Sequence, residues 1–344
     1  MRKIASVFAL GLCLLMLGCA ARDSGAYDRG MDALSRGDYS AAVQEFQTAA
    51  DQDGRKAEAY RGQGIASLRQ GDYAGAIALF SQSLEEMKHS NRKFRRDVLL
   101  YQAEAYEKNR QSSQAGAIYD QLIKEDKDAV SYVLRGGGKL REGDAQGARE
   151  DFDRALEQET TYQICLQIYQ VCTEANREAD GAEYLERALE LTPEGAEESR
   201  LQAQVYYYLG DYQKAQAGLS AAAEDGDEDS LRMLGSLYLE TGETAGARTL
   251  YENALEEGSH PAAAYNGLAL CDILEEDYES ALRNIRQGIS CRDESVMRDL
   301  LYNEIVVYER QLDFETAQSK MREFLERYPG DEEALRENQF LQSR

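Results

Sequence analysis

Apolar residues recur every three to four positions along most of the chain, and short polar breaks separate these stretches. This period is that of an amphipathic helix, which turns its apolar stripe toward a neighbouring element. The polar breaks contain a recurring eleven-residue phrase, which reads RGDYSAAVQEF at 36–46 and QGDYAGAIALF at 70–80. The pattern predicts an all-α chain of helices that are paired across short turns.

The phrase returns at a nearly constant interval. Clear copies lie at 142–152, 209–219 and 241–251, and weaker copies follow the same plan. One residue of each copy is taken as its anchor, and successive anchors are 34, 39, 33, 33, 34, 32, 34 and 36 residues apart. The nine anchors are Gly37, Gly71, Arg110, Gly143, Asn176, Gly210, Gly242, Glu276 and Leu312. Repetition favours reading Arg36-Gly37-Asp38 as a corner between helices rather than as an adhesion tripeptide.

Small and large residues alternate in a fixed register around these anchors. Glycine lies seven positions before four of the glycine anchors, at Gly30, Gly64, Gly136 and Gly235. Alanine lies five positions after eight anchors, at Ala42, Ala76, Ala115, Ala148, Ala215, Ala247, Ala281 and Ala317. A large residue follows four positions later, at Phe46, Phe80, Tyr119, Phe152, Leu219, Tyr251, Ile285 and Met321. Small beside large at helical spacing is what closely packed helices require.

A period near 34 residues with this register resembles the tetratricopeptide-repeat family over about residues 24–329. The resemblance implies an all-α, right-handed superhelical solenoid of about nine helix-turn-helix repeats. Leu335 and Phe340 of a C-terminal capping helix, 331–343, are expected to turn inward. The expected repeats are 24–57, 58–92, 97–129, 130–161, 162–195, 196–227, 228–260, 262–297 and 298–330.

The first twenty residues differ from everything that follows. Arg2 and Lys3 precede an uncharged apolar stretch that ends before Cys19, which is the layout of an export signal. The closing letters MLGC resemble the lipobox of bacterial lipoproteins, although Met16 stands where that family usually has Leu. The resemblance implies a signal peptide over 1–18, lipid on Cys19, a short tether over 19–25, and a position on the outer side of a bacterial membrane. The alternative is a plain secretory signal or a membrane stub.

The charge balance limits the class of partner. The chain has 39 Lys and Arg against 63 Asp and Glu, a net charge of −24. A nucleic-acid binder neutralises phosphates with clustered cations, so this composition argues against a nucleic-acid partner. The one basic cluster lies at Lys88, Arg92, Lys93, Arg95 and Arg96, and it either docks an acidic partner or lipid or extends a helix into solvent.

The run Gly136-Gly137-Gly138 lies inside an expected helix, where glycine costs about 1 kcal/mol relative to alanine. It is either a hinge or a close crossing of helices.

The sequence contains few residue patterns that are typical of catalytic or metal-binding sites. The two histidines, His89 and His260, have no partner at a metal-binding spacing. The cysteines at 165, 172, 271 and 291 are interpreted as small core residues without disulfides. No catalytic residue, metal site or cofactor is predicted, and the protein is not expected to be an enzyme.

The family resemblance places a partner-binding groove on the first helices of the repeats. The candidate groove residues are Arg61, Ile65, Tyr101, Glu104, Leu134, Arg200, Gln204, Tyr207, Tyr208, Arg232, Asn266, Leu270 and Tyr302. The leading hypothesis is a membrane-tethered scaffold that binds peptides or proteins. The alternatives are a non-catalytic regulatory or assembly subunit of a cell-envelope enzyme or export machine, and self-association through the end repeats.

Overall fold

The structure is a computed structural model that describes residues 25–52, 55–87 and 91–344. These residues form nineteen α-helices and no β-strand. None of the described helices is both long enough and apolar enough to cross a membrane. The predicted signal peptide, the lipid site Cys19 and most of the tether lie outside the described residues.

Helices α1 to α18 form nine consecutive antiparallel hairpins, and α19 follows alone. The first five hairpins are α1 (Ala26–Ser35) with α2 (Tyr39–Gln52), α3 (Lys56–Arg69) with α4 (Tyr73–Glu85), α5 (Arg92–Lys108) with α6 (Ser112–Asp126), α7 (Ala129–Glu142) with α8 (Ala145–Gln158), and α9 (Tyr162–Glu174) with α10 (Glu178–Ala188). The rest are α11 (Gly195–Leu209) with α12 (Tyr212–Glu224), α13 (Glu228–Glu240) with α14 (Thr244–Glu256), α15 (Pro261–Leu274) with α16 (Tyr278–Ser290), and α17 (Glu294–Arg310) with α18 (Phe314–Arg327), before α19 (Glu332–Leu341).

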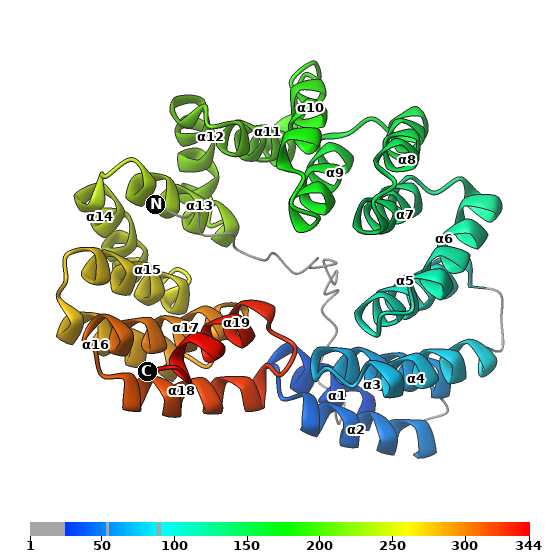
Figure 1. The fold of residues 1–344 in the computed structure, drawn as a ribbon, viewed down its shortest axis with the longest axis horizontal. Helices are drawn as coiled ribbons and strands as arrows, with labels where there is room; N and C mark the ends of the chain where they lie inside the picture. Colours follow the sequence, from blue (N-terminus) through cyan, green and yellow to red (C-terminus); the bar gives the residue numbers. More distant parts are fainter. Residues whose placement is uncertain (1–24, 53–54, 88–90) are drawn as a thin grey trace.

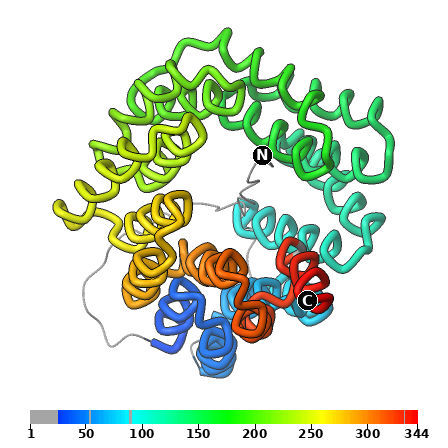
Figure 2. Tube along the Cα trace, turned by 60° about the vertical axis from the view of Figure 1, so that its left-hand side comes forward, coloured from blue at the N-terminus to red at the C-terminus, as the bar shows by residue number. Residues whose placement is uncertain are grey.

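The hairpins stack side by side into a curved solenoid that runs once around a ring (Figures 1 and 2). Odd-numbered helices lie on the inside and even-numbered helices on the outside (Figure 1). A single hairpin is too small to bury its own apolar face, so each one shelters that face on its neighbours. The predicted all-α solenoid of nine repeats is confirmed, whereas the right-handed sense of the superhelix stays a prediction.

The turn inside each hairpin has the geometry that the anchor residues predicted. All nine anchors have a positive φ, including the non-glycine anchors Arg110, Asn176, Glu276 and Leu312. A residue in this left-handed conformation ends a helix, and glycine adopts it without strain. After six of the anchors an aspartate accepts a hydrogen bond from a backbone N–H in the first turn of the next helix; these are Asp38, Asp72, Asp144, Asp211, Asp277 and Asp313.

The corner at Arg36-Gly37-Asp38 follows the same plan. Gly37 has φ +67°, and the backbone N–H of Ala41 donates a hydrogen bond to Oδ1 of Asp38 at 3.0 Å. The tripeptide therefore links α1 to α2, as the repetition predicted.

The core confirms the register of small and large residues. The eight predicted alanines and the eight large residues that follow them are all buried. A Cβ atom placed on Gly64 would lie 2.6 Å from the ring of Phe80, and one on Gly235 would overlap the hydroxyl of Tyr251. The glycines of the inner helices therefore make room for the aromatic rings of the outer helices.

The glycine run in α7 is a close crossing of helices. A Cβ atom on Gly136 would lie 2.4 Å from the ring of Phe152 in the same hairpin, and one on Gly137 would lie 2.9 Å from Cβ of Val171 in α9. Both glycines are buried, so a side chain at either position would push two helices apart. Of the two interpretations left open by the sequence, the contacts favour packing over a hinge.

Three arginines of the basic cluster at the start of α5 form ion pairs with the adjacent repeat elements, whereas Lys93 is exposed. Arg92 pairs with Asp126 at 3.2 Å, Arg95 with Glu125 at 2.7 Å, and Arg96 with Asp128 at 2.6 Å. These carboxylates lie at the end of α6 and at the N-cap of α7. The pairing favours the interpretation of the cluster as a helix extension; Lys88 lies outside the described residues.

The prediction for the capping helix is wrong in register. Leu335 and Phe340 of α19 are 42% and 41% exposed, whereas Ala334 and Leu341 are fully buried. Residues 334 and 341 are two helical turns apart and therefore share the face that packs on α18. The ring of Phe340 is instead covered by the guanidinium of Arg344, 4.7 Å from its centroid.

Candidate functional site

The inner face of the ring is a nearly continuous layer of odd-numbered helices (Figure 1). From α7 to α17, each odd-numbered helix contacts the next one, and α1, α3 and α5 do the same. The candidate groove residues all come from these helices, so the structure brings them onto one layer. Most of them are engaged in contacts between neighbouring repeats.

Three candidates join α3 to α5. The guanidinium of Arg61 donates a hydrogen bond to Asp97 and lies over the ring of Tyr101, 5.5 Å from its centroid. Arg69 donates a hydrogen bond to Glu104 at 3.3 Å. A cation over an aromatic face is attracted by the ring quadrupole, so these contacts help to fix the angle between two repeats.

Two apolar candidates belong to the core. Ile65 is only 7% exposed and packs in the cluster around Phe80. Leu134 is half-buried against the cluster around Tyr119. These side chains stabilise the repeats rather than presenting an apolar surface to a partner.

Tyr207 and Tyr208 are part of a row of four tyrosines. The ring of Tyr208 lies 5.0 Å from that of Tyr169 and 5.5 Å from that of Tyr207, which in turn lies 5.9 Å from the ring of Tyr212. The hydroxyls of Tyr207 and Tyr212 donate hydrogen bonds to Glu240 at 3.1 and 2.8 Å. Burial and the Glu240 carboxylate raise the pKa of Tyr207, so its hydroxyl stays protonated. The row joins α9, α11, α12 and α13.

The polar candidates beside this row are also partnered. Arg200 pairs with Glu197 at 2.7 Å, and Arg232 pairs with Asp229 at 2.5 Å, each one turn away on its own helix. Gln204 is hydrogen-bonded to a hydroxyl of the tyrosine row. The middle of the inner face is therefore a polar surface whose charges are balanced locally.

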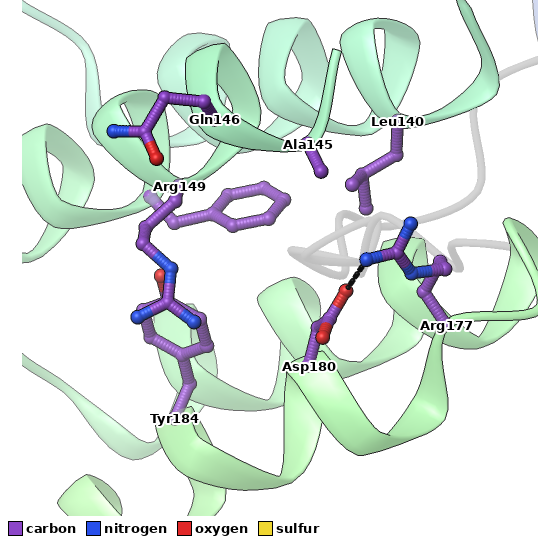
Figure 3. Close-up of a pocket in the computed structure, with 8 residues that line it drawn as sticks. Leu140, Ala145, Gln146, Arg149, Arg177, Asp180 and Tyr184 are labelled. Atoms are coloured by element: carbon purple, nitrogen blue, oxygen red, sulfur yellow. Dashed lines mark ion pairs between the residues drawn. The ribbon is translucent and has the colours of Figure 1, made fainter. Parts of the chain in front are cut away.

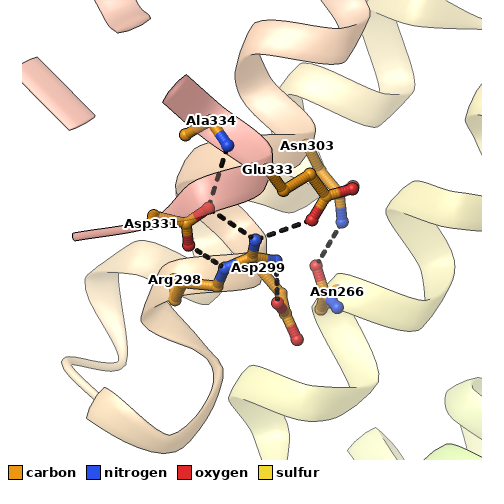
Figure 4. A network of polar contacts seen from close by, with 7 residues as sticks. All are labelled: Asn266, Arg298, Asp299, Asn303, Asp331, Glu333 and Ala334. Atoms are coloured by element: carbon orange, nitrogen blue, oxygen red, sulfur yellow. Dashed lines mark hydrogen bonds and ion pairs between the residues drawn. The ribbon is translucent and has the colours of Figure 1, made fainter. Parts of the chain in front are cut away.

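An asparagine pair joins α15 to α17. Nδ2 of Asn303 donates a hydrogen bond to Oδ1 of Asn266 at 2.9 Å (Figure 4). Each side-chain amide has further capacity, which leaves the donor of Asn266 and the acceptor of Asn303 for another group. Leu270, one turn beyond Asn266, is half-buried beside them. The sequence candidates include Asn266 and Leu270 but miss Asn303, because its role depends on its contact with the preceding repeat.

Tyr302 contacts Arg298, whose polar network attaches the capping helix (Figure 4 shows the network around Arg298). The guanidinium of Arg298 lies over the ring of Tyr302, 5.0 Å from its centroid. Arg298 also donates hydrogen bonds to Asp331 at 3.0 Å, to Glu333 at 2.8 Å and to Asp299 at 3.1 Å. Asp331 caps α19, so Arg298 holds the start of that helix against α17. Tyr302 therefore supports the end of the solenoid.

A small pocket of about 130 Å³ lies between the hairpins α7–α8 and α9–α10 (Figure 3). Its lining residues are Leu140, Ala145, Gln146, Arg149, Phe152, Arg177, Asp180 and Tyr184. Arg177 pairs with Asp180 at 2.5 Å, and Arg149 pairs with Glu183 at 3.1 Å. Burial raises the pKa of Tyr184 to about 12, so this phenol is neutral at physiological pH. The pocket is lined by both apolar side chains and ion-paired charged side chains.

Two family models match parts of the chain, and both describe a tetratricopeptide repeat. One matches residues 27–88 and 232–286, and the other matches residues 67–135. The chain contains tetratricopeptide repeats. No curated protein has a sequence that matches this chain.

Solved structures with similar folds are distant in sequence. A tetratricopeptide repeat protein from Parabacteroides merdae is 16% identical, with 81% of this chain and 97% of that chain covered and a TM-score of 0.40. Yeast Tom70 is 15% identical, with 92% and 88% covered and a TM-score of 0.45. MamA from Desulfovibrio magneticus RS-1 is 19% identical, with 50% and 97% covered and a TM-score of 0.37. Resemblances this low give no information about a partner.

The cysteines of the tetratricopeptide repeats are free thiols, as the sequence predicted. Cys165, Cys172 and Cys271 are buried, and desolvation raises their pKa values to about 11, 12 and 11. Cys291 is exposed, so its interpretation as a core residue is wrong. It lies in the turn between α16 and α17, outside the packed interface. Among the described residues, no group of three or more His, Cys, Asp or Glu side chains is placed to hold a metal ion.

A carboxyl group that the sequence candidates miss lies near the end of α17 in the last hairpin. Oε1 of Glu309 is buried and has no hydrogen-bond partner. Burial, and then the charge of Glu337 on α19, raise the pKa of Glu309 to about 7, against a small opposing effect of Arg310. A carboxyl group in this position favours the protonated form.

Glu309→Gln is expected to stabilise the protein at pH 8 but not at pH 4. The folded state keeps its proton up to about pH 7 whereas the unfolded state loses it near 4.5, so wild-type stability falls as pH rises between these values. The neutral amide of the variant does not lose a proton, so its free energy of unfolding at pH 8 should exceed that of the wild type by about 1–2 kcal/mol after allowance for solvent screening. Urea denaturation at both pH values measures the difference. Glu326→Gln, on an exposed face of α18, is the control, and an equal pH response in both variants would contradict the prediction.

Proposed function

We propose that this protein is a membrane-anchored, non-catalytic scaffold that holds an extended peptide segment of a protein partner on the inner face of its repeats. The observation that carries the proposal is the Asn266–Asn303 pair, which joins two repeats and leaves one amide donor and one carbonyl acceptor unused. A peptide group presents one acceptor and one donor, so it complements this pair. Leu270 beside the pair offers an apolar contact for a side chain of the same segment.

The anchor is proposed from the N-terminal sequence. A cysteine after the letters MLG, preceded by a short basic start and an apolar stretch, supports lipid attachment at Cys19. Two or three acyl chains hold a protein on a membrane stably. The tether of 19–25 is short, so the repeats would work close to the outer side of a bacterial membrane.

The test is peptide binding by the full chain in detergent. An array of overlapping peptides is probed with wild-type protein and with Asn303→Ala, and mass spectrometry of the same material examines Cys19. We expect selective binding of a subset of peptides, a loss of about fivefold or more in affinity in Asn303→Ala, as for a lost hydrogen bond of about 1 kcal/mol, and diacylglycerol on Cys19.

Asn253→Ala is the matched control, because Asn253 is an exposed asparagine of the outer helix α14. It should bind the same peptides as the wild type. Equal losses in the two variants would place the site elsewhere, and an unmodified Cys19 thiol in membrane-bound protein would remove the anchor.

A further inference from the structure

The two ends of the solenoid lie against each other. In both views of the molecule, the first two hairpins lie beside the last one (Figures 1 and 2). The contact is made by opposite edges of the solenoid. The turns within the first two hairpins, at Gly37 and Gly71, meet the start of α17 and the segment that follows α18.

The first point of contact is between Gly37 and Glu294. A Cβ atom placed on Gly37 would lie 2.5 Å from Oε2 of Glu294, so the absence of a side chain lets the carboxylate reach the turn. Arg327 donates hydrogen bonds to the same carboxylate, with Nη2 2.6 Å from both oxygens. The side chain of Glu294 is only 17% exposed. The turn of the first repeat thus covers an ion pair of the last repeat.

The second point of contact joins the turn of the second repeat to the segment after α18. A Cβ atom on Gly71 would lie 3.5 Å from Cγ of Pro329, and one on Gly330 would lie 2.5 Å from the hydroxyl of Tyr73. The single turn that contains Gly71 and Tyr73 therefore fits against residues 329 and 330. Together with the contact between Gly37 and Glu294, this contact shows that the edges meet at two successive repeats.

Burial of two tyrosines accompanies the contact. Burial raises the pKa of Tyr39, in the first repeat, and that of Tyr328, in the last. The charges of Glu294 and Arg327 also act on Tyr39, although more than 250 positions separate them in the sequence. Tyr39 of the first repeat therefore lies close to Glu294 and Arg327 of the last repeat, with little solvent between them.

The contact is weaker than the junctions between consecutive repeats. None of the core clusters formed by the described residues contains side chains from both ends. Gly37, Tyr39 and Tyr73 are only half-buried, and Pro329 and Gly330 are exposed. Local stability follows buried apolar contact, so these edges separate before any repeat unfolds.

We propose that the two ends form a gate: the turns at Gly37 and Gly71 close on Glu294, Pro329 and Gly330, and a partner segment flanked by folded domains reaches the inner face only when this contact opens. The inference rests on the proposed function for the partner, but closure itself does not. A closed ring admits a free chain end by threading. A segment with folded domains at both ends cannot thread, so it enters only when the contact between the two ends opens. The gate therefore controls the entry of internal segments but not of free chain ends.

Site-specific photo-cross-linking in the full chain in detergent tests closure. A benzoylphenylalanine at position 73 should form a cross-link to residues 328–331 of the same molecule, identified by mass spectrometry of the digested monomer. Gly37→Leu puts a side chain where Glu294 lies and should lower the yield by about fivefold or more. Glu294→Ala, which leaves the turn unchanged, is the second variant and should lower the yield in the same direction.

Gly143→Leu is the matched control for backbone strain. Gly143 is also a turn glycine, with φ +89° against +67° at Gly37, but nothing lies within 4 Å of a Cβ atom at Gly143. Its cross-link yield should equal that of the wild type. A cross-link only between molecules, none in the wild type, or equal yields in the two leucine variants would overturn the closed ring.

The gating step has a separate readout. Peptides bound in the array are fused at both ends to folded domains, and their association rates with the wild type and with Glu294→Ala are compared. A rate at least about threefold higher in Glu294→Ala supports the gate, as expected when the open form becomes more populated. An unchanged rate overturns gating while leaving peptide binding intact. Absence of any peptide binding would end the proposed function and leave the cross-link unaffected.

Discussion

Phe80→Ala is expected to lower the free energy of unfolding by about 3–5 kcal/mol, because it empties the space between two repeats. Phe80 is fully buried, and its ring fills the gap left by Gly64 in the same hairpin. The ring also stacks on Tyr101 of the next repeat, with 5.9 Å between the centroids. The cavity cannot close easily, since the backbones of α3 and α4 are already in close contact. Urea denaturation followed by helical circular dichroism measures the loss.

Phe340→Ala is the control for this substitution. Phe340 is 41% exposed on α19, and the same change there should cost less than about 1 kcal/mol. Equal shifts of the two denaturation midpoints would contradict the register of small and large residues on which the solenoid depends.

Asp151→Asn is expected to destabilise the protein by about 2–3 kcal/mol, because it leaves two cations without their shared carboxylate. The side chain of Asp151 is only 4% exposed. Its oxygens accept hydrogen bonds from Arg135 at 2.5 and 2.9 Å, and Nζ of Lys139 lies 2.8 Å away. The loss is smaller than for a fully buried pair, since Arg135 also contacts Asp120 and both cations reach solvent.

Asp153→Asn, two positions along the same helix, is the control, because it removes the same charge from a more exposed position. Asp153 pairs with Arg187 at 2.9 Å, but both side chains are largely accessible to solvent. Removing this charge should cost no more than about 0.5–1 kcal/mol. If thermal denaturation of the two variants gave the same stability, the special role of the buried carboxylate would be excluded.

The sequence predicts the fold well because the rules of the repeat are local. The glycine at the turn, the aspartate that caps the next helix and the alanine five positions after the anchor each act within one hairpin. The nine anchors all have the predicted backbone conformation, even where Leu312 replaces glycine. The prediction for Leu335 and Phe340 is wrong, because α19 lies outside the nine hairpins and the repeat register does not fix which of its faces packs on α18.

The candidate inner face is predicted less well. The repeat register places Arg61, Tyr101 and Tyr207 on the inner helices, and the structure agrees. The repeat register does not reveal the hydrogen bonds that link this surface across neighbouring repeats, which join Arg61 to Asp97, Arg69 to Glu104 and Tyr207 to Glu240. These partners depend on the angle between hairpins, which no spacing in the sequence encodes.

The sequence by itself determined the all-helical repeats, their number and the positions that pack inside each hairpin, because these follow from the period of apolar residues and from turn chemistry within about 34 residues. Only the tertiary structure decided that Asn303 meets Asn266, that Glu309 lies buried beside Glu337, and that the turn at Gly37 reaches Glu294. The last contact joins residues more than 250 positions apart, and it arises from small rotations that accumulate over nine repeats. Such a sum depends on every interface in the solenoid, so no single stretch of sequence contains it.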